Sequence, residues 1–551
     1  MIENKTNNIP DVLTEILSNR GISGEENLNE YFSNKPKATY NPFLLNNMEA
    51  GVDLILASIE KNKKIVIFGD YDTDGITSTA VLLKVLGGLT DNLDYYIPSR
   101  IKEGYGLNKE AVSKIKKEGG DLLITVDCGS VSKEEVKYAK EIGLDVIVTD
   151  HHTIGDKMAD GIVINPKAPN DKYPFKELAG VGVAYKLAQG IQRRLNLPKN
   201  VITEVLDLVA IGTIGDMVSL TDENRTLVKY GIRLIKSGEG NKGLKRLIEM
   251  SSINNQKINS RDISYGVVPK INASGRLGDA TIGVKLMKAT TADEIEKYCN
   301  ILIDNNNERK RIQDDVYEKC VDIVEKKHLD DNFLVVDAND SHEGITGIVA
   351  GKLKEKYQKP TIIVTNNENG VKGTGRSVAG VNLYELINNH NELFVRFGGH
   401  KAACGFSARK ENLNEIRRYL NADMDLMISL NPNILTQGVQ ADKRIEINDA
   451  DADLVKALEL MEPTGSGNEV PTFAINDVKI KEYYFMGNED KHAKFVATDT
   501  QGHQMVCILF GKASEYRSLI TSDNSINLIG AVELNEWNNK SNIQIRVKSI
   551  S

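Results

Sequence analysis

Three short apolar runs in the first third of the chain each end in acidic or imidazole side chains. They read KIVIFGDYDTDG, LLITVDCG and DVIVTDHH, and helix-like stretches separate them. Short apolar runs that alternate with helices favour a parallel sheet whose strands are buried on both faces. Because the carboxyl ends of parallel strands share one edge, where ligands bind in such folds, the polar side chains should meet there. The pattern predicts an α/β fold with a ligand-binding cleft.

The polar residues at this edge are of the types that bind hard metal ions. They are Asp70, Asp72, Asp74, Asp127, Asp150, His151 and His152, and a later apolar run, LVAIGTIGDMVSL, adds Asp216. Carboxylates crowded into a cleft repel one another unless a cation compensates their charge. Oxygen ligands with imidazole and without thiolate favour Mn²⁺ or Mg²⁺ over structural zinc. Two such ions about 3.5–4 Å apart, bridged by a carboxylate, would suit phosphoester hydrolysis.

These aspartates also have interpretations other than a metal site. Any single one is as readily a cap for the following helix, but several on one sheet edge favour a shared site. The DYDTDG spacing imitates the start of a calcium-binding EF-hand loop, which Val81 at the twelfth position and the preceding strand exclude. The segment DTDG also resembles the aspartyl-phosphate phosphatase signature, an alternative that leaves Asp127 and the Asp-His-His run without a role.

The remainder of the chain predicts further folding units. Its 551 residues suffice for about three to four domains. A charged stretch over 293–327 reads as one helix or two, a second α/β pattern begins at Phe333, and five strand-like runs follow Pro471. Five short strands suggest a small OB-fold barrel. We expect an α/β multidomain protein with an N-terminal arm (1–49), a parallel-sheet domain (50–265), a connector with a long helix (266–328), a second α/β domain (329–428) and a C-terminal OB-fold β-barrel (429–551).

Charge and composition leave a nucleic-acid partner open. Lys and Arg number 69 against 77 Asp and Glu, a net charge of −8, but a basic groove can coexist with an acidic remainder. The five cysteines are scattered without C-x-x-C spacing, which indicates free thiols in a reducing cytosol. With no signal-like start and no apolar stretch of about 18 residues, we expect a cytoplasmic protein without a membrane partner.

The motifs GDYDTDG, VDCG, TDHH and GTIGDM, in this order, resemble the DHH phosphoesterase superfamily, which is named after the Asp-His-His triplet. Within it, further motifs resemble the RecJ exonuclease family over nearly the whole chain. These are SRIKEGYGLN, INASGRLGDA, SHEGITGIVAGKL, KGTGRS, FGGHKAACGF and EPTGSGNEVP. KGTGRS has threonine where serine is usual, with the hydroxyl retained. The resemblance implies a DHH domain, a DHH-associated domain and a nucleic-acid-binding OB-fold.

The resemblance also implies roles for individual residues. The implied metal ligands are Asp70, Asp72, Asp74, Asp127, His151 and Asp216, with Asp127 as the bridge. The implied catalytic residues are His152 at the scissile phosphate, Asp127, and His400 on a Gly-Gly-His loop. The implied substrate-binding residues are Arg100, Tyr105, Arg276 on an arginine loop, Thr374, Arg376, Ser377, Gly398, Gly399 and His400. Glycines admit the backbone close to a phosphate and arginine forks suit a terminal phosphate, although such turns in isolation are often plain tight turns.

Members of this family hydrolyse single-stranded DNA from the 5′ end to 5′-mononucleotides in DNA repair and recombination. The resemblance therefore implies a monomeric exonuclease that uses two Mn²⁺ or Mg²⁺ ions on single-stranded DNA. A single-strand-binding protein and a repair helicase are the further partners it implies. Two alternatives remain: a phosphodiesterase of the same superfamily that acts on oligonucleotides or cyclic dinucleotides, and a metal-free scaffold, against which the intact Asp/His set argues.

Overall fold

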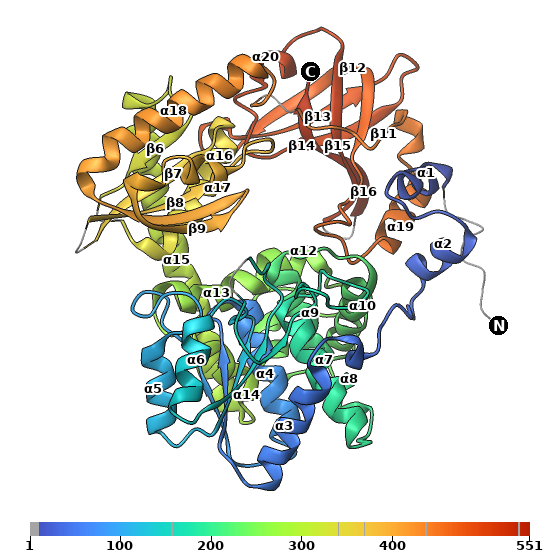
Figure 1. Ribbon diagram of the computed structural model, residues 1–551. Helices are drawn as coiled ribbons and strands as arrows, with labels where there is room; N and C mark the ends of the chain where they lie inside the picture. The colour runs from blue at the N-terminus through green and yellow to red at the C-terminus, as the bar shows by residue number, and fades with distance from the viewer. Residues whose placement is uncertain (1–9, 156–157, 340, 368–369, 436–437, 538–539) are drawn as a thin grey trace, which may run out of the picture.

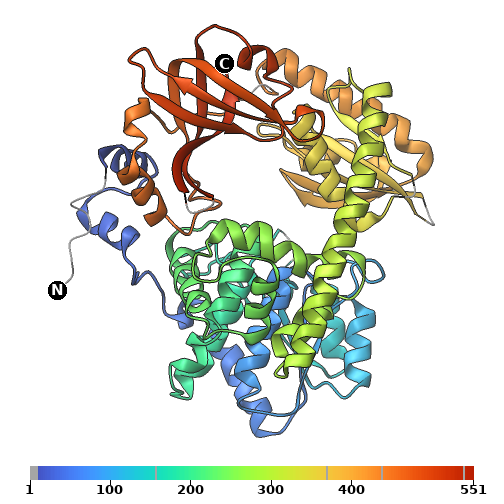
Figure 2. The same cartoon turned by 180° about the vertical axis from the view of Figure 1, so that it is seen from behind.

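The computed structural model describes residues 10–155, 158–339, 341–367, 370–435, 438–537 and 540–551. Its body consists of three sheets, of which the first lies at the bottom of Figure 1 and the other two lie above it. A single helix, α15 (Ala292–Lys327), runs from the first unit up to the second, as Figure 2 shows from behind. The charged stretch that predicted one helix or two is therefore one helix of 36 residues.

The first sheet is the one predicted from the apolar runs. All its strands are parallel, in the order β2, β1, β3, β4, β5, with bounds β1 (Ile65–Gly69), β2 (Leu93–Tyr96), β3 (Leu122–Val126), β4 (Asp145–Thr149) and β5 (Ile162–Ile164). Ile65 and Ile67 pack into one core, and Val66 and Phe68 into another. Burial on both faces explains the continuous apolar runs. The edge strands were not predicted, because β2 (LDYY) is only partly buried and contains Asp94, and β5 has only three residues.

Helices cover both faces of this sheet. One face packs against α3 (Met48–Glu60), α4 (Thr73–Leu86), α7 (Gly180–Arg194) and α9 (Leu206–Asp216), and the other against α5 (Lys109–Lys117) and α6 (Lys133–Glu141). The unit continues through α8 (Asn200–Thr203), α10 (Asp222–Ser237), α11 (Lys242–Met250), α12 (Ser260–Asp262), a π-helical turn (Ile263–Val267), α13 (Val268–Leu277) and α14 (Thr281–Lys288). The last of these lead into α15 and so toward the second sheet.

The second sheet is mixed, in the order β6, β7, β8, β10, β9. Its strands are β6 (Leu334–Asp337), β7 (Thr361–Asn367), β8 (Gly370–Arg376), β9 (Phe394–His400) and β10 (Ala403–Ala408), of which only β6 and β7 are paired in parallel. On one face, α16 (Glu343–Tyr357) shares a core with α15. On the other face lie α17 (Leu383–Asn388) and α18 (Leu413–Leu430). The connector helix is thus an integral part of the second unit's core.

The C-terminal unit is a closed five-stranded barrel, which confirms the predicted OB-fold. Its strands are β12 (Phe473–Met486), β13 (His492–Thr498), β14 (Gln504–Leu509), β16 (Lys540–Ile550) and β15 (Ile526–Trp537), and β15 pairs back with β12. Closure leaves the barrel without free strand edges. The short strand β11 (Lys443–Arg444) pairs with β12, and α20 (Arg517–Ile520) precedes β15.

The N-terminal arm packs against the C-terminal barrel. Its helices, α1 (Asp11–Asn19) and α2 (Glu25–Phe32), share a core with the barrel and α19 (Ala452–Leu460) (Figure 1). The buried Arg225 of α10 lies 4.0 Å from the centre of the Tyr31 ring and donates hydrogen bonds to the carbonyl groups of Met461 and Pro463. The arm thereby ties the barrel to the first unit. No helix in the described ranges is long and apolar enough to cross a membrane.

Candidate metal centre and phosphate pocket

The carboxyl edge of the first sheet carries its aspartates where the strands end. Asp70 directly follows β1, Asp127 follows β3 and Asp150 follows β4. Asp72 caps α4, because its Oδ1 accepts hydrogen bonds from the backbone N–H groups of Asp74 (2.9 Å) and Gly75 (3.1 Å). The helix-cap and metal-site interpretations are therefore compatible for Asp72, whose second oxygen takes no part in the cap.

The first turn of α7 holds the next two carboxylates in place. Asp74 accepts hydrogen bonds from the backbone N–H groups of Gly180 (2.7 Å) and Val181 (2.8 Å). Asp127 has a left-handed backbone (φ 60°), which few residues other than glycine adopt. Position 180 must be glycine here, because a Cβ atom would lie 2.6 Å from the Asp127 Cβ. The positive end of the α7 dipole partly offsets the negative charge of this edge.

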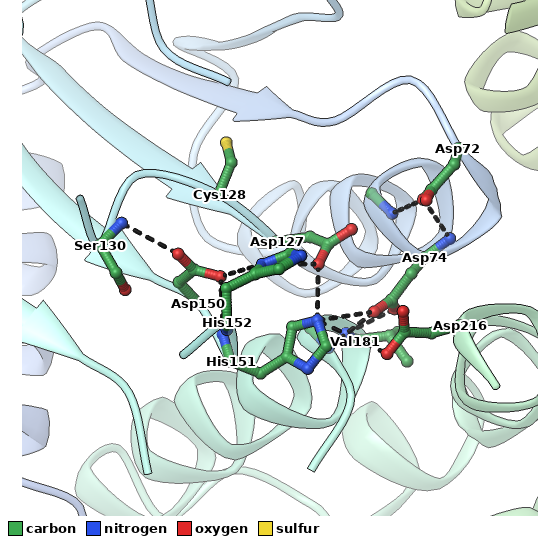
Figure 3. Close-up of polar contacts among 12 residues, drawn as sticks. Asp72, Asp74, Asp127, Cys128, Ser130, Asp150, His151, His152, Val181 and Asp216 are labelled. Atoms are coloured by element: carbon green, nitrogen blue, oxygen red, sulfur yellow. Dashed lines mark hydrogen bonds and ion pairs between the residues drawn. The ribbon is translucent and has the colours of Figure 1, made fainter. Parts of the chain in front are cut away.

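His151 and Asp216 complete the cluster (Figure 3). The His151 Nε2 atom lies 3.1 Å from Asp127 Oδ1, 3.5 Å from Asp216 Oδ2 and 3.9 Å from Asp74 Oδ2. Asp216 comes from the C-terminal end of α9 and not from a strand. A sheet edge and a helix end therefore build the cluster together.

The described residues contain three groups of side chains that could each hold a metal ion. Within each group the ligand atoms lie within 4.8 Å of one another: Asp74 with His151 and Asp216, Asp70 with Asp72 and Asp127, and Asp127 with His151 and His152. Asp127 belongs to two of the groups. Its position therefore suits the bridging role expected of it.

The chemistry of the cluster fits divalent ions. Several buried atoms have no hydrogen-bond partner among the described residues: Asp70 Oδ1, Asp127 Oδ1, Asp216 Oδ2 and both ring nitrogens of His151. Buried polar atoms are normally paired. Burial, followed by neighbouring carboxylates, raises the pKa of Asp70, Asp74 and Asp127 and brings that of Asp216 to about 7. Burial, followed by the charge of His152, lowers the pKa of His151 to about 3, so its imidazole is neutral and free to bind a metal.

His152 lies beside the cluster and is oriented by Asp150. Its Nδ1 lies 2.7 Å from Asp150 Oδ1, and its Nε2 lies 3.2 Å from the Tyr105 hydroxyl. The second Asp150 oxygen accepts the backbone N–H of Ser130 at 2.9 Å. Burial lowers the pKa of His152, but the hydrogen bond and charge of Asp150 outweigh it and raise the pKa to about 9. The sequence placed Asp150 among the hard ligands of this edge, and in the structure it contacts His152 and the Ser130 backbone and lies outside the three metal-binding groups.

A cavity of about 550 Å³ opens beside the metal-binding cluster. The acidic part of its lining comprises Asp70, Asp72 and Asp216, and the basic part comprises Arg100, Arg276 and Arg309. Tyr105, which is 53% exposed, also lines it. Carboxylates and guanidinium groups thus line one space, and its guanidinium end suits an anion such as a phosphate.

Arg276 links the two α/β units. It lies in the last turn of α13, so the expectation of an arginine loop was wrong, and its Nη1 donates to the Gly344 carbonyl of α16 at 3.0 Å. One turn further along α16, Gly347 packs closely beside Arg376 of β8. A Cβ atom at position 347 would lie only 3.0 Å from Arg376 Nη2. The start of α16 therefore brings the two arginines toward each other across the domain boundary.

Thr374 and Ser377 occupy different environments. The Thr374 hydroxyl lies on β8 and accepts a hydrogen bond from Thr346 of α16 at 3.3 Å, close to the arginines. The buried Ser377 hydroxyl instead donates to the Val381 carbonyl at 2.8 Å, inside its own turn. Of the two, Thr374 is better placed to meet a ligand.

The Gly-Gly-His segment is the end of strand β9, so the expectation of a loop was wrong. Gly398, Gly399 and His400 pair with β10, and all three are exposed. Gly399 has φ 144°, and a Cβ there would lie 2.3 Å from the Ala403 carbonyl oxygen. Strand pairing thus accounts for this glycine. His400 lies outside the three metal-binding groups.

Two polar residues of this region were missed by the sequence reasoning. Asn272 of α13 accepts hydrogen bonds from the backbone N–H (2.8 Å) and hydroxyl (2.9 Å) of Thr73, next to the metal-binding aspartates. Arg309 comes from the middle of α15, where the surrounding charged sequence resembles an ordinary solvated helix. Asn272 stands inside the motif INASGRLGDA, from which only Arg276 was given a role. No local motif marks Arg309, which reaches the site through tertiary packing.

Comparison with known proteins agrees with this architecture. Family models match three stretches: "DHH family, N-terminal domain" over residues 64–213, "DHHA1 domain" over 330–425 and "RecJ OB domain" over 441–549. The single-stranded-DNA-specific exonuclease RecJ of Bacillus subtilis is 34% identical over 98% of this chain and 68% of its own length. That of Escherichia coli is 28% identical over 98% and 96%.

A solved structure shares the whole arrangement. The crystal structure of RecJ in complex with Mn²⁺ from Thermus thermophilus matches with a TM-score of 0.81 at 25% sequence identity, covering 99% of this chain and 78% of that one. The resemblance in sequence extends over all three units, and the resemblance in structure does the same. The chain therefore belongs to the RecJ family of DHH proteins.

Proposed function

We propose that this protein is a single-stranded-DNA-specific exonuclease that degrades DNA from the 5′ end to 5′-mononucleotides. The observation that carries the proposal is one cavity in which carboxylates of the metal-binding cluster, Asp70, Asp72 and Asp216, face several arginines. Such a cavity is suited to hold a scissile phosphate at its acidic end and a strand terminus at its basic end. The names of the relatives and the Mn²⁺ complex of one of them support this function.

Two Mn²⁺ or Mg²⁺ ions would be held by the cluster. The proposed ligands are Asp70, Asp72, Asp74, Asp127, His151 and Asp216, with Asp127 between the ions. When bound, the ions supply Lewis acidity and neutralise charge at the scissile phosphate. The carboxylates that repel one another in their absence then become favourable partners.

The remaining residues of the site would orient the substrate and handle a proton. His152, held protonated by Asp150, would donate to a phosphate oxygen or to the departing oxygen. Arg276 and Arg376, with Thr374, would hold the terminal phosphate across the domain boundary. We further assign substrate contacts to Arg100, Ser377, Gly398, Gly399 and His400.

Tyr105 would admit an unpaired strand and exclude a duplex. It lies at the cavity with its hydroxyl next to His152, and its ring meets that of Tyr71 edge-on at 6.5 Å between centroids. Aromatic rings stack on the bases of a single strand, whereas the bases of a duplex are paired and stacked on one another. Beyond the cavity, the barrel would hold the strand, and Tyr484 on β12, at 64% exposure, is available for stacking.

We propose a cytoplasmic monomer that acts in DNA repair and recombination with a single-strand-binding protein and a repair helicase. The proposed functional units are a DHH domain (50–265), a connector (266–328), a DHH-associated domain (329–428) and an OB-fold domain (429–551), preceded by the arm (1–49).

Incubation with end-labelled DNA tests this function. Single-stranded and double-stranded DNA, labelled at either end, would be mixed with Mn²⁺, Mg²⁺ or a chelator. We expect mononucleotides released from the 5′ end of single strands, only with metal. Release from the 3′ end, equal cleavage of duplex DNA, or activity on dinucleotides with none on long strands would contradict the proposal.

A further inference from the structure

Four arginines lie at or next to the cavity beside the metal cluster, and none has an ion-pair partner among the described residues. Arg100, Arg276 and Arg309 line the cavity, and Arg376 and Arg276 both contact the start of α16 across the domain boundary. Among the described residues, none of the four guanidinium groups pairs with a carboxylate; their bonds go to carbonyl, amide or ring groups. Buried cations without counter-ions cost free energy, so an anion is the natural partner of this group.

Arg309 is the most enclosed of the four. Only 9% of its surface is exposed, although it lies on a helix that is otherwise rich in solvated charges. Its Nη2 donates to the Asn306 side chain at 3.0 Å and its Nη1 to the Gln313 side chain at 2.7 Å. Its Nε is buried and has no hydrogen-bond partner among the described residues. The nearby Asp314 pairs instead with Lys352, at 3.2 Å.

This arrangement fixes the guanidinium before any ligand arrives. Neutral amides one turn away on either side hold both terminal nitrogens, so they orient the group without neutralising its charge. An arginine with that support loses little side-chain entropy when it binds an anion. Building such support inside a helix is costly unless the charge serves a ligand in the cavity.

We infer that Arg309 is a specificity-determining residue that recognises a terminal phosphate monoester, together with Arg276. The inference rests on the proposed function and deepens it. A terminal phosphate carries close to two negative charges at neutral pH, whereas an internal diester carries one. Two guanidinium groups that line the same cavity therefore favour the strand terminus over an internal position. Arg309 would place the terminus from the connector helix, which links the two α/β units.

The test compares two strand ends and two variants. Hydrolysis of single-stranded DNA with a 5′-phosphate or a 5′-hydroxyl would be measured for the wild type, Arg309→Gln and Arg311→Gln. Arg311 is a matched control, because it lies two residues away on the same helix but pairs with the exposed Glu308 and Asp315. Loss of a charged hydrogen bond corresponds to about 10–100-fold.

We expect Arg309→Gln to lower the ratio of phosphate-end to hydroxyl-end kcat/KM by about that factor, and Arg311→Gln to leave the ratio unchanged. An equal loss on both ends, or no loss, would overturn the inference. If Arg309→Gln does not fold, Asn306→Ala tests the inference instead. This variant keeps the charge of Arg309 but removes the side chain that holds its Nη2 atom. It should lower the same ratio by about 2–10-fold, and an unchanged ratio would count against the inference.

Binding without turnover separates this inference from the proposed function. In chelator, fluorescence anisotropy would measure the affinity for a 5′-phosphorylated and a 5′-hydroxyl oligonucleotide. A deoxynucleoside monophosphate and inorganic phosphate serve as competitors that distinguish a strand end from free phosphate. If the wild type degrades no DNA but Arg309→Gln still loses phosphate-end affinity, the function fails and the inference stands. If the wild type degrades DNA but binds phosphorylated and hydroxyl ends equally well, the proposed function stands and the inference fails.

Discussion

The two sides of the cavity are built in opposite ways. The acidic side gathers Asp70, Asp72, Asp127 and His151 from loops that directly follow parallel strands. The basic side gathers Arg276 from α13, Arg309 from α15 and Arg376 from β8. The acidic side thus depends on one sheet and the helices packed on it, since Asp216 comes from the end of α9. The basic side depends in addition on how two units pack together. The difference teaches that the acidic side needs contacts within the first unit only, whereas Arg309 and Arg376 join the basic side through contacts between units.

The largest expected effect comes from the acidic side. Replacing Asp127 with Asn removes the carboxylate shared by two metal-binding groups, so we expect hydrolysis to fall by about a thousandfold or more. Steady-state rates with Mn²⁺ measure this, and circular dichroism checks folding. Asp145→Asn is the matched control, since Asp145 lies exposed at the opposite end of β4 and pairs with Lys63 at 3.1 Å. Substantial activity in Asp127→Asn would refute a shared ligand.

A smaller, selective effect is expected on the basic side. Arg276→Gln should lower kcat/KM on 5′-phosphorylated ends by about 10–100-fold and on hydroxyl ends much less, because only the terminal dianion needs the second guanidinium. Parallel rate measurements on the two substrates give the ratio. Equal losses on both ends would mean that Arg276 acts by holding α16 through its bond to Gly344 and not by binding a phosphate.

His152 allows the acidic side to be probed by pH. Its pKa is about 9 because of Asp150, so Asp150→Asn should return the pKa toward the ordinary value of about 6.5. A proton donor is lost as pH rises through its pKa, and the alkaline limb of the pH profile should therefore move toward neutral pH. At pH 8 we expect about a tenfold loss. An unmoved alkaline limb would show that His152 donates no proton in the limiting step.

The smallest effect is a change in stability on metal removal. Burial and Asp72 raise the folded-state pKa of Asp216 to about 7, above its unfolded value of 3.8. The folded state then binds more protons between these values, so stability falls as pH rises from about 4 to 7. In chelator, lowering the pH from 7 to 6 should stabilise the protein by about 1 kcal/mol. Denaturant titrations measure this; excess Mn²⁺ should abolish the gain, and a gain that persists would exclude Asp216 as a ligand.

The sequence alone predicted the parts of the molecule that local patterns encode. Apolar runs followed by aspartates identified β1, β3 and β4 and the acidic edge, because a buried parallel strand has a recognisable composition. Residues such as Asp72 and Asp127 were found because they stand directly after those strands. The OB-fold barrel was predicted for a similar reason, since alternating strand-like runs separated by turns mark a small barrel.

Tertiary structure decided what no local pattern encodes. Arg309 lies among solvated charges on α15, and its burial arises from tertiary packing, since both α13 and α16 pack against that helix. The sequence does not distinguish the role of Asp150 from that of His151, and only the short distance from Asp150 to His152 shows that it orients this ring. The N-terminal arm precedes the first α/β unit in the chain, but it packs on the barrel, which lies at the C-terminal end of the chain. Strand ends follow from composition and spacing, but contacts between distant segments depend on how their surfaces fit.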